Sequence, residues 1–409
     1  MIRHLFKLTW NRKRSTTLVF LELVGCFLVL GAVATGLAYT IDNWRRPLGF
    51  EPKHVWRAEL GYGPFYRATD EQRRQAIDFA LRVLADVQAM PEVESAALME
   101  NSPYSGSESL WTFDLEGREV NVLFGPATTD LSRALGLRLV SGRWFEKADE
   151  TLDWVPVVIS RNLARSRFGA ADPLGQKLRS QPNRPAEEDE RDFRVVGVME
   201  DYRRNGETLG TPYAAFSLVR LNRELPQGSD SPPRHLMVRT RPGTGARFEQ
   251  ELGKRILSMV PEWNIEVDFL ERTRTRWLRQ RIVPLAVLAT VGAFMLLMVG
   301  FGLVGVLWHS VTRRTSEIGL RRALGATAAD VRSQIVGELL VVTTLAVGLG
   351  AVVFLQFPIL GVLGFLSWRI YLYGLVAATA VLYCFVVVCA LYPGWMATRV
   401  HPARALQHE

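Results

Sequence analysis

The sequence has few of the residues that build disulfides, metal sites or nucleophilic active sites. Its 409 residues include 3 cysteines and 6 histidines, and the histidines are scattered along the chain. All three cysteines, Cys26, Cys384 and Cys389, lie in long apolar runs, so the polar part of the chain has no disulfide framework. No His-Glu-x-x-His, Cys-x-x-Cys or Gly-x-Ser-x-Gly sequence occurs. We therefore expect no metal site and no catalytic site, and we predict that the chain is not an enzyme.

A phosphate-binding loop is also missing from the sequence. Gly-x-x-x-x-Gly-Lys-Ser/Thr does not occur, and the nearest segment, 169–177, has the wrong spacing and lacks the Ser or Thr. We therefore expect the chain itself to bind no cofactor, and in particular no ATP or Mg²⁺.

Four long apolar runs account for much of the 48% hydrophobic content. They cover residues 17–41, 282–308, 335–357 and 370–391, and each exceeds the roughly 20 residues that cross a bilayer core. The first run is too long for a signal-peptide core, and no small-residue cleavage site follows it. The sequence therefore predicts a membrane protein with four transmembrane α-helices.

The net charge of +8 is not spread evenly over the chain. Residues 41–281 contain 36 Lys and Arg and 36 Asp and Glu, whereas 1–16, 309–334 and 392–409 are all basic. The positive-inside rule places these three segments in the cytoplasm and the large 42–281 region in the periplasm, which implies a bacterial inner membrane. Because the excess charge flanks the membrane, we expect no nucleic-acid partner.

The first 16 residues have apolar side chains near helical spacing, opposite basic ones. This pattern fits an amphipathic helix that lies on membrane lipid at the cytoplasmic face, and it also fits a simple basic flank.

Between the first two spans, strand-like and helix-like patterns alternate. Such β-α-β repetition predicts an α+β extracytoplasmic domain large enough for two subdomains. The polar segment 270–281 predicts a stalk helix that runs into the second span, with a kink at Pro284. Strands are predicted at 55–60, 93–98, 109–115, 119–124, 154–159, 193–199, 235–240 and 263–269, helices at 70–88, 129–135, 160–168 and 244–259, and an exposed loop at 180–192.

A few residues inside the spans are candidates for helix association or coupling. Glu22 and Glu338 are acidic residues near the predicted cytoplasmic ends of the first and third spans, where they serve either local hydrogen bonding or helix association. Gly300, Gly302 and Gly305 in the second span would let another helix approach closely.

The connection between the second and third spans is a charged segment, SVTRRTSEIGLRRALGATAADVRSQIVGELL, at residues 310–340. Thr315 or Ser316 can cap a short helix that Gly325 ends, and a second helix is predicted to begin near Thr327 or Ala328. A cytoplasmic helical hairpin of this kind suits docking to a partner protein, and its alternative interpretation is a solvated connector.

This segment resembles a motif of the MacB/FtsX permease family, R-x-x-E-I-G-x-x-R-A-L-G-A, which begins here at Arg314. Other pieces resemble the family in the same order, and together they cover essentially the whole chain. They are GLRLVSGRWF at 136–145, VPVVISRNLARSRFGAADPLG at 155–175, VVGVMED at 195–201 and PGWMATRVHPARAL at 393–406.

The resemblance implies the permease subunit of an ABC transporter that works by mechanotransmission. Such a subunit performs mechanical work outside the membrane, for export or extraction of a substrate, rather than passing the substrate through a membrane cavity. Two protomers would pair, as a homodimer or heterodimer, and a periplasmic adaptor is a further implied partner. Since 16 residues precede the first span, the ATPase that binds ATP and Mg²⁺ is expected on a separate chain. The implied ATPase-coupling residues are Glu317, Ile318, Leu320, Arg321, Arg322, Leu324 and Gly325. The alternative function is a signalling scaffold that activates an extracytoplasmic hydrolase, as in cell-division complexes.

Overall fold

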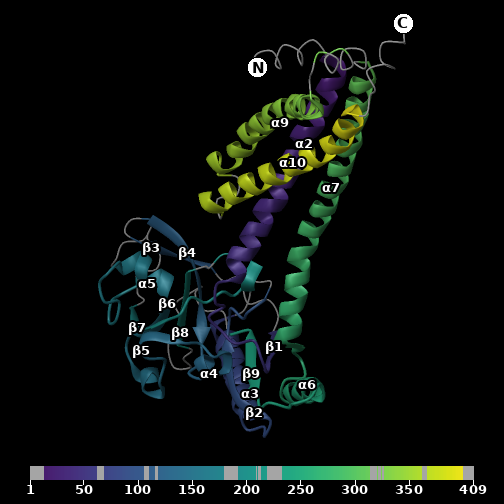
Figure 1. Cartoon of the computed structure of the whole chain (residues 1–409). Helices are drawn as coiled ribbons and strands as arrows, with labels where there is room; N and C mark the ends of the chain where they lie inside the picture. Colours follow the sequence, from purple (N-terminus) through teal and green to yellow (C-terminus); the bar gives the residue numbers. More distant parts are fainter. Residues whose placement is uncertain are drawn as a thin grey trace. The chain divides into compact units, whose positions relative to one another are not determined.

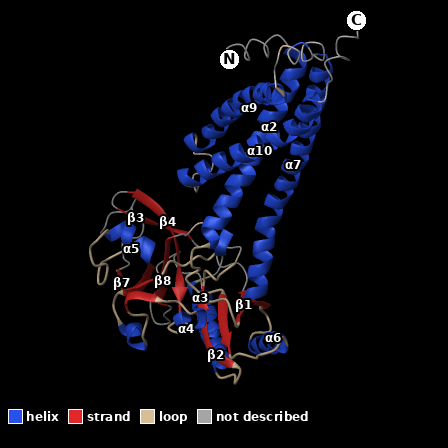
Figure 2. Ribbon diagram, in the orientation of Figure 1, coloured by secondary structure: helices blue, strands red, loops and turns tan. Residues whose placement is uncertain are grey.

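The computed structural model describes residues 13–61, 69–105, 110–115, 118–178, 192–208, 210, 213–218, 233–313, 320, 324, 327–361 and 366–398. The chain divides into two compact units, one formed by Met1–Asp42 with Arg281–Glu409 and the other by Asn43–Gln280. Among the described residues, every strand lies in the second unit (Figures 1 and 2).

Four long helices carry the four predicted apolar runs, which confirms the predicted number of candidate spans in the described part of the chain. They are α2 (Lys13–Trp44), α7 (Leu270–Arg313), α9 (Ala328–Ile359) and α10 (Trp368–Thr398). α7 is assigned as one helix through Pro284, so the predicted stalk and the second span form a single element. The amphipathic helix was predicted for residues 1–16. Residues 13–16 belong to α2, and residues 1–12 lie outside the described residues.

Apolar packing holds the four helices together. Leu23 and Phe27 of α2, Leu303 of α7, Ala346 of α9 and Leu382 of α10 are all buried in one cluster. The opposite faces of these helices expose large apolar side chains, such as Phe301, which is 74% exposed. In water such surface would be costly, whereas lipid chains solvate it.

The second unit is built on a mixed sheet in the order β10-β1-β9-β2-β4-β8-β6-β7-β5, with β3 paired to β4. The α+β class of this domain is thereby confirmed. The strands are β1 (Val55–Gly61), β2 (Val93–Met99), β3 (Leu110–Leu115), β4 (Arg118–Ala127), β5 (Leu139–Gly142), β6 (Val155–Ser160), β7 (Phe193–Met199), β8 (Tyr213–Leu218), β9 (His235–Thr240) and β10 (Asn264–Phe269).

The sheet has one shared core on one face and two separate cores on the other. Alternate residues of each strand point to opposite faces, and Met99, Leu123 and Val158 from both halves enter the shared core. On the other face, α3 (Asp70–Gln88) and α6 (Arg247–Met259) cover β1, β2 and β9, while α5 (Arg161–Phe168) covers β6 and its neighbours. The halves meet where β2 pairs with β4 through a single register pair, Met99 with Ala127. Two subdomains therefore share one sheet.

Most predicted elements occur with end positions shifted by a few residues. The hairpin is formed as predicted, with Leu115 opposite Arg118, and α4 (Leu131–Leu135) is shorter than predicted. Two strands were not predicted. β5 is exposed along its whole length, and β8 contains two alanines, so neither shows the alternation of large apolar and polar residues that marks a strand. Most of the predicted 180–192 loop lies outside the described residues.

Candidate functional site

Only two of the predicted ATPase-coupling residues belong to the described part of the chain. Leu320 and Leu324 are 52% and 80% exposed, and the N–H of Leu324 donates to the carbonyl of Leu320 at 3.0 Å, which is one helical turn. The described residues do not include Glu317, Ile318, Arg321, Arg322 and Gly325. Nearby, Thr327 and Asp330 form a capping box at the start of α9, at the position predicted for the second helix. The coupling role of the segment remains a prediction.

The glycines predicted to permit helix association occupy different surroundings. A Cβ on Gly300 would lie 3.1 Å from the Phe385 ring of α10, and one on Gly302 would lie 3.0 Å from Oε2 of Glu22 in α2. Gly300 and Gly302 are therefore at helix–helix contacts within this unit, whereas a Cβ on Gly305 would meet nothing within 4 Å. Oε2 of Glu22 is buried without a hydrogen-bond partner among the described residues. Glu338 is half-buried on α9.

The most concentrated polar structure in the α+β domain surrounds Tyr202–Glu207, the segment that follows β7, which we call the anchoring loop. Tyr202, Arg203 and Arg204 are almost completely buried, at 0%, 1% and 1% exposure. Burial of guanidinium groups costs free energy unless each is hydrogen-bonded. The partners of these arginines therefore show what the loop holds in place.

Arg203 holds the last residues of α2. Its Nη1 donates to the carbonyls of Asn43 at 2.7 Å and Arg46 at 3.2 Å, and its Nη2 donates to Oδ1 of Asn43 at 3.0 Å. The end of a helix has carbonyls without intrahelical partners and carries partial negative charge, which a cation satisfies well. The N–H of Arg203 also donates to the carbonyl of Leu48, just beyond the helix.

The other end of the anchoring loop holds the start of α7. Nε of Arg274 donates to Oε1 of Glu207 at 2.7 Å, and the same pair forms a close ion pair in which the Glu207 side chain is 5% exposed. One helical turn further along, the Trp277 ring packs against Tyr104, with centroids 6.4 Å apart. One loop of six residues therefore contacts both helices through which the domain continues into the candidate spans.

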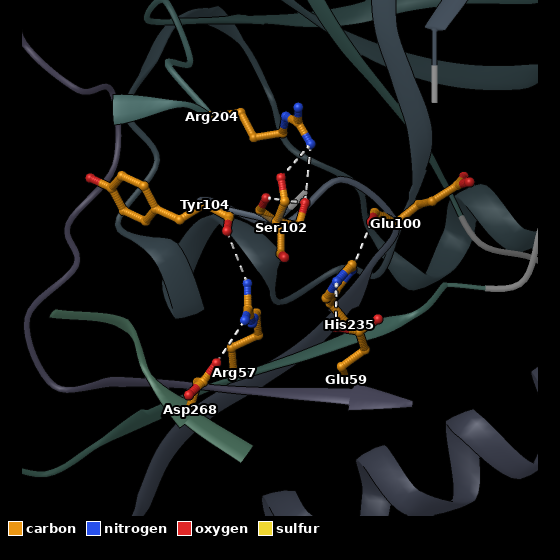
Figure 3. Close-up of polar contacts among 9 residues, drawn as sticks. Arg57, Glu59, Glu100, Ser102, Tyr104, Arg204, His235 and Asp268 are labelled. Atoms are coloured by element: carbon orange, nitrogen blue, oxygen red, sulfur yellow. Dashed lines mark hydrogen bonds and ion pairs between the residues drawn. The ribbon is translucent and has the colours of Figure 1, made fainter. Parts of the chain in front are cut away.

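A second set of polar contacts ties this loop to the sheet (Figure 3). Nη1 of Arg204 donates to the carbonyl and the hydroxyl of Ser105, both at 3.1 Å. Arg57 of β1 donates to the carbonyl of Tyr104 at 3.3 Å and to Oδ2 of Asp268 at 2.8 Å. Asp268 is the register partner of Arg57 on β10, two residues before α7 begins. The contacts thus run from the anchoring loop through β1 to the base of α7.

The backbone at the centre of this cluster is unusual. Tyr104 has a φ of +58°, a region that a residue with a side chain enters at a cost, and its N–H donates to the carbonyl of Arg204 at 2.9 Å. Gly206 has a φ of +71°, and a Cβ there would lie 2.5 Å from the Tyr104 ring. Glycine at 206 is therefore what lets the two segments meet.

Two buried titratable side chains of this cluster have shifted pKa values. Burial, and next the Glu207 carboxylate, raise the pKa of the Tyr104 hydroxyl above its usual range. Burial, and next the Arg57 guanidinium, lower the pKa of His235 to about 3, although its Nδ1 lies 2.7 Å from the carbonyl of Glu100. Glu59, whose carboxylate lies 4.0 Å from Nε2 and is 45% exposed, does not offset this. His235 is therefore neutral at physiological pH.

Chemically, the cluster is a structural connection. No group of three His, Cys, Asp or Glu side chains in the described part of the chain is placed to hold a metal ion. Many of its polar groups contact one another or backbone carbonyls, and the segments they join are the ends of α2 and α7 and the sheet. The hydroxyls of Ser102 and Tyr104 and Nε2 of His235 are buried without a hydrogen-bond partner among the described residues.

The anchoring loop was not predicted from the sequence. DYRRNGE at 201–207 follows a strand and contains two adjacent arginines and a glycine, a composition typical of an exposed turn. A surplus of polar residues at the end of a buried strand was the available signal. It does not distinguish a solvated turn from one buried beneath two helices.

Two family models match separate parts of the chain. The MacB-like periplasmic core domain matches residues 25–254, which is more than half of the sequence. The FtsX-like permease C-terminal region matches residues 289–402 and so includes the predicted coupling segment.

Individual relatives are similar over different extents. The macrolide export ATP-binding/permease protein MacB of Bdellovibrio bacteriovorus is 23% identical over 432 residues, covering 100% of this chain and 62% of that protein. The pyoverdine export ATP-binding/permease protein PvdT of Pseudomonas savastanoi is 27% identical over 239 residues, covering 53% of this chain and 34% of that protein. The crystal structure of the periplasmic region of MacB from Actinobacillus actinomycetemcomitans covers 56% of this chain and 94% of that chain, at 13% identity and a TM-score of 0.39. The chain thus spans less than two thirds of the length of the MacB and PvdT relatives.

Proposed function

The chain belongs to the MacB/FtsX-type permease family, and from this premise we propose that it is the permease subunit of an ABC transporter of the mechanotransmission type. A separate ATPase binds ATP and Mg²⁺ and docks on the cytoplasmic 309–334 segment. Its cycle moves α2 and α7, and the periplasmic domain follows, which drives export or extraction of a substrate. In this proposal the protein lies in a bacterial inner membrane, with both termini on the cytoplasmic side.

One observation carries the proposal. The anchoring loop bonds the end of α2 through Arg203 and the start of α7 through Glu207. Through Arg204 it bonds Ser105, whose neighbour Tyr104 accepts a hydrogen bond from Arg57 of β1. A domain that does not move with the helices would not need one loop that is hydrogen-bonded to both helices and connected to the sheet. The relatives' names support an ATPase partner, since both are ATP-binding/permease proteins, while the 409 residues contain no phosphate-binding loop.

The proposed partners follow from the same premise. A second permease protomer, identical or related, would cover part of the exposed apolar surface of the helices, and lipid would cover the rest. A periplasmic adaptor would bind the domain.

The decisive experiment is co-purification of the full chain in detergent with candidate ABC ATPases. An ATPase should co-purify, and its hydrolysis rate should rise in the complex. Arg321→Glu with Arg322→Glu should abolish both, because both guanidinium groups would be replaced by carboxylates at the proposed docking surface. If association and stimulated hydrolysis persist in this variant, the coupling segment is assigned wrongly. Recovery of an extracytoplasmic hydrolase in place of an adaptor would favour the signalling scaffold.

A second experiment tests transmission rather than docking. Arg203→Lys keeps a cation at the end of α2 but replaces the two Nη atoms that reach three oxygens with a single nitrogen. It should therefore leave ATPase association intact and reduce the ATP-dependent change in protease sensitivity of the domain. Arg255→Gln removes an arginine of the same domain that bonds only Asp86, and it is the matched control.

A further inference from the structure

The exposed face of α7 changes character at one position. Before Ile282 its exposed side chains are polar, among them Arg276, Arg279 and Gln280. From Ile282 onward the exposed face includes many large apolar side chains, beginning with Ile282 at 44% and Val283 at 51% exposure. This change marks the edge of the hydrocarbon layer on the side of the α+β domain.

Along α2 the exposed side chains change from apolar to polar toward the C-terminal end of the helix. Ile41 and Trp44 are each 52% exposed, and Arg45 follows directly, also exposed. Tryptophan is typical of the boundary between hydrocarbon and headgroups. The edge of the hydrocarbon layer therefore falls at Trp44 on α2 and at Ile282 on α7.

Exposed arginines lie directly beyond these edges at positions 45, 46, 276, 279 and 281. Arg46 and Arg281 have other interactions, and we call Arg45, Arg276 and Arg279 the juxtamembrane arginines. At 1.5 Å per residue, Arg279 and Arg276 lie about 4.5 and 9 Å from Ile282 along the helix. The headgroup layer is roughly 5 to 8 Å thick. The Arg279 backbone therefore lies within this layer, whereas the Arg276 backbone lies just beyond it, at a distance that its extended side chain can span.

The partners of these arginines differ from those of their neighbours. Arg272 pairs with Glu249 at 3.1 Å, and Arg274 pairs with Glu207. Arg45, Arg276 and Arg279 have no ion-pair partner among the described residues. Positive charge at this face is also the reverse of what the positive-inside rule favours, so membrane topology does not account for it.

We infer that the juxtamembrane arginines bind the phosphates of anionic phospholipids in the leaflet on the side of the α+β domain. A guanidinium group bonds two phosphate oxygens at once, which matches the chemistry of a headgroup. Because Arg45 lies two residues beyond Asn43, the residue that Arg203 holds, lipid bound there would contact the protein beside the anchoring loop. The inference requires membrane insertion and does not rest on an ATPase partner.

The test uses the full chain in phosphatidylcholine vesicles selected for an outward-facing α+β domain by protease cleavage. Spin-labelled phosphatidylglycerol or phosphatidylcholine is added to the outer leaflet only, so the basic segments on the other side do not contribute. Electron paramagnetic resonance then gives the relative association constant of the two lipids. We expect a preference for phosphatidylglycerol of roughly fivefold, the effect of one arginine at an anionic surface, and its loss in high salt.

The variant Arg45→Gln with Arg276→Gln and Arg279→Gln should bring this preference to about onefold. The matched control is Arg241→Gln with Arg247→Gln and Arg272→Gln, which removes the same charge from exposed positions of the domain that are further along the chain from the apolar runs. All six side chains are exposed, and equal unfolding temperatures in detergent would exclude a fold defect. An unchanged preference in the juxtamembrane variant, or an equal loss in the control, would overturn the inference.

Discussion

Two arginines of the α+β domain make similar contacts in opposite surroundings. Arg203 bonds three oxygens at the end of α2 and is 1% exposed. Arg255 of α6 bonds both oxygens of Asp86 on α3, at 2.5 and 2.6 Å, and its side chain is 53% exposed. Water can replace the partner of Arg255, whereas the two Asn43 oxygens that Arg203 bonds are buried with it. Burial, rather than the number of hydrogen bonds, therefore decides which contact the fold depends on.

The largest expected effect comes from removing the buried arginine. Arg203→Met leaves the carbonyl and the side-chain oxygen of Asn43 buried without their donor, so we expect a loss of about 4 kcal/mol in the free energy of unfolding. Denaturant unfolding of the full chain in detergent, followed by tryptophan fluorescence, measures it. Arg203→Lys should lose less, because a charged donor remains. Equal unfolding midpoints for Arg203→Met and the unchanged chain would contradict the comparison.

Acid should weaken the same cluster through His235. Its pKa is about 3 in the folded chain and near 6.5 when unfolded, so below pH 6.5 only the unfolded chain takes up the proton. Stability should fall by about 1.4 kcal/mol per pH unit, or about 3 kcal/mol by pH 4.5. Full stability returns above pH 6.5.

The control for this pH dependence is His235→Phe, which removes the titrating group. The difference in unfolding free energy between pH 7 and pH 4.5 should shrink in this variant. If the slope is unchanged, His235 is not neutral in the folded chain, and the buried cluster tolerates charge better than we infer.

A smaller effect is expected at the glycine that lets the loop meet Tyr104. Gly206→Ala combines a positive φ with a Cβ 2.5 Å from the Tyr104 ring, so we expect about 2 kcal/mol of destabilisation. Gly243→Ala is the control, since its φ is +94° but nothing lies within 4 Å, and about 1 kcal/mol is expected from the backbone alone. Equal losses measured by thermal unfolding would show that the ring contact is unimportant.

The smallest effect is expected at the exposed pair. Arg255→Gln should shift the unfolding midpoint less than any change above, because water replaces Asp86 as the partner. The Arg255 hydrogen bond lowers the pKa of Asp86, so whatever the pair contributes is present above the usual Asp pKa and is lost as the pH falls below it. Repeating the melts in high salt should remove the remaining difference. If Arg255→Gln lowered the unfolding midpoint more than Gly206→Ala does, the exposed pair would matter more to the fold than the buried cluster, which contradicts our expectation.

The sequence predicted elements with strong periodicity and missed features that depend on tertiary contact. Some elements show a periodic pattern of apolar residues in the sequence, because buried positions recur regularly along each of them. These elements are the four apolar runs, α3 and the strands β1, β2, β7 and β9. β5 and β8 show no such pattern, since one is exposed and the other has small side chains. The shared core could not be predicted either, because it forms between residues as distant as Val55 and Phe216.

The candidate site residues likewise include some that were predicted from the sequence and some that were not. Gly300 and Gly302 were predicted from spacing alone, and both lie at helix contacts, although their role in coupling remains a prediction. Arg203, Arg204 and Glu207 were not predicted, because polar residues in a turn are normally solvated. Their burial follows from where α2 ends and α7 begins, which is long-range information that local composition does not contain.

Pro284 has a consequence for the backbone of α7. The helix has 44 residues and is therefore about 66 Å long. Proline has no N–H, so Pro284 cannot donate to the carbonyl of Gln280, and the ladder of backbone hydrogen bonds has a gap there. This gap falls beside residues 280 and 281, where the chain divides into its two compact units. The helix therefore resists bending least at the position where the polar segment ends and the apolar run begins.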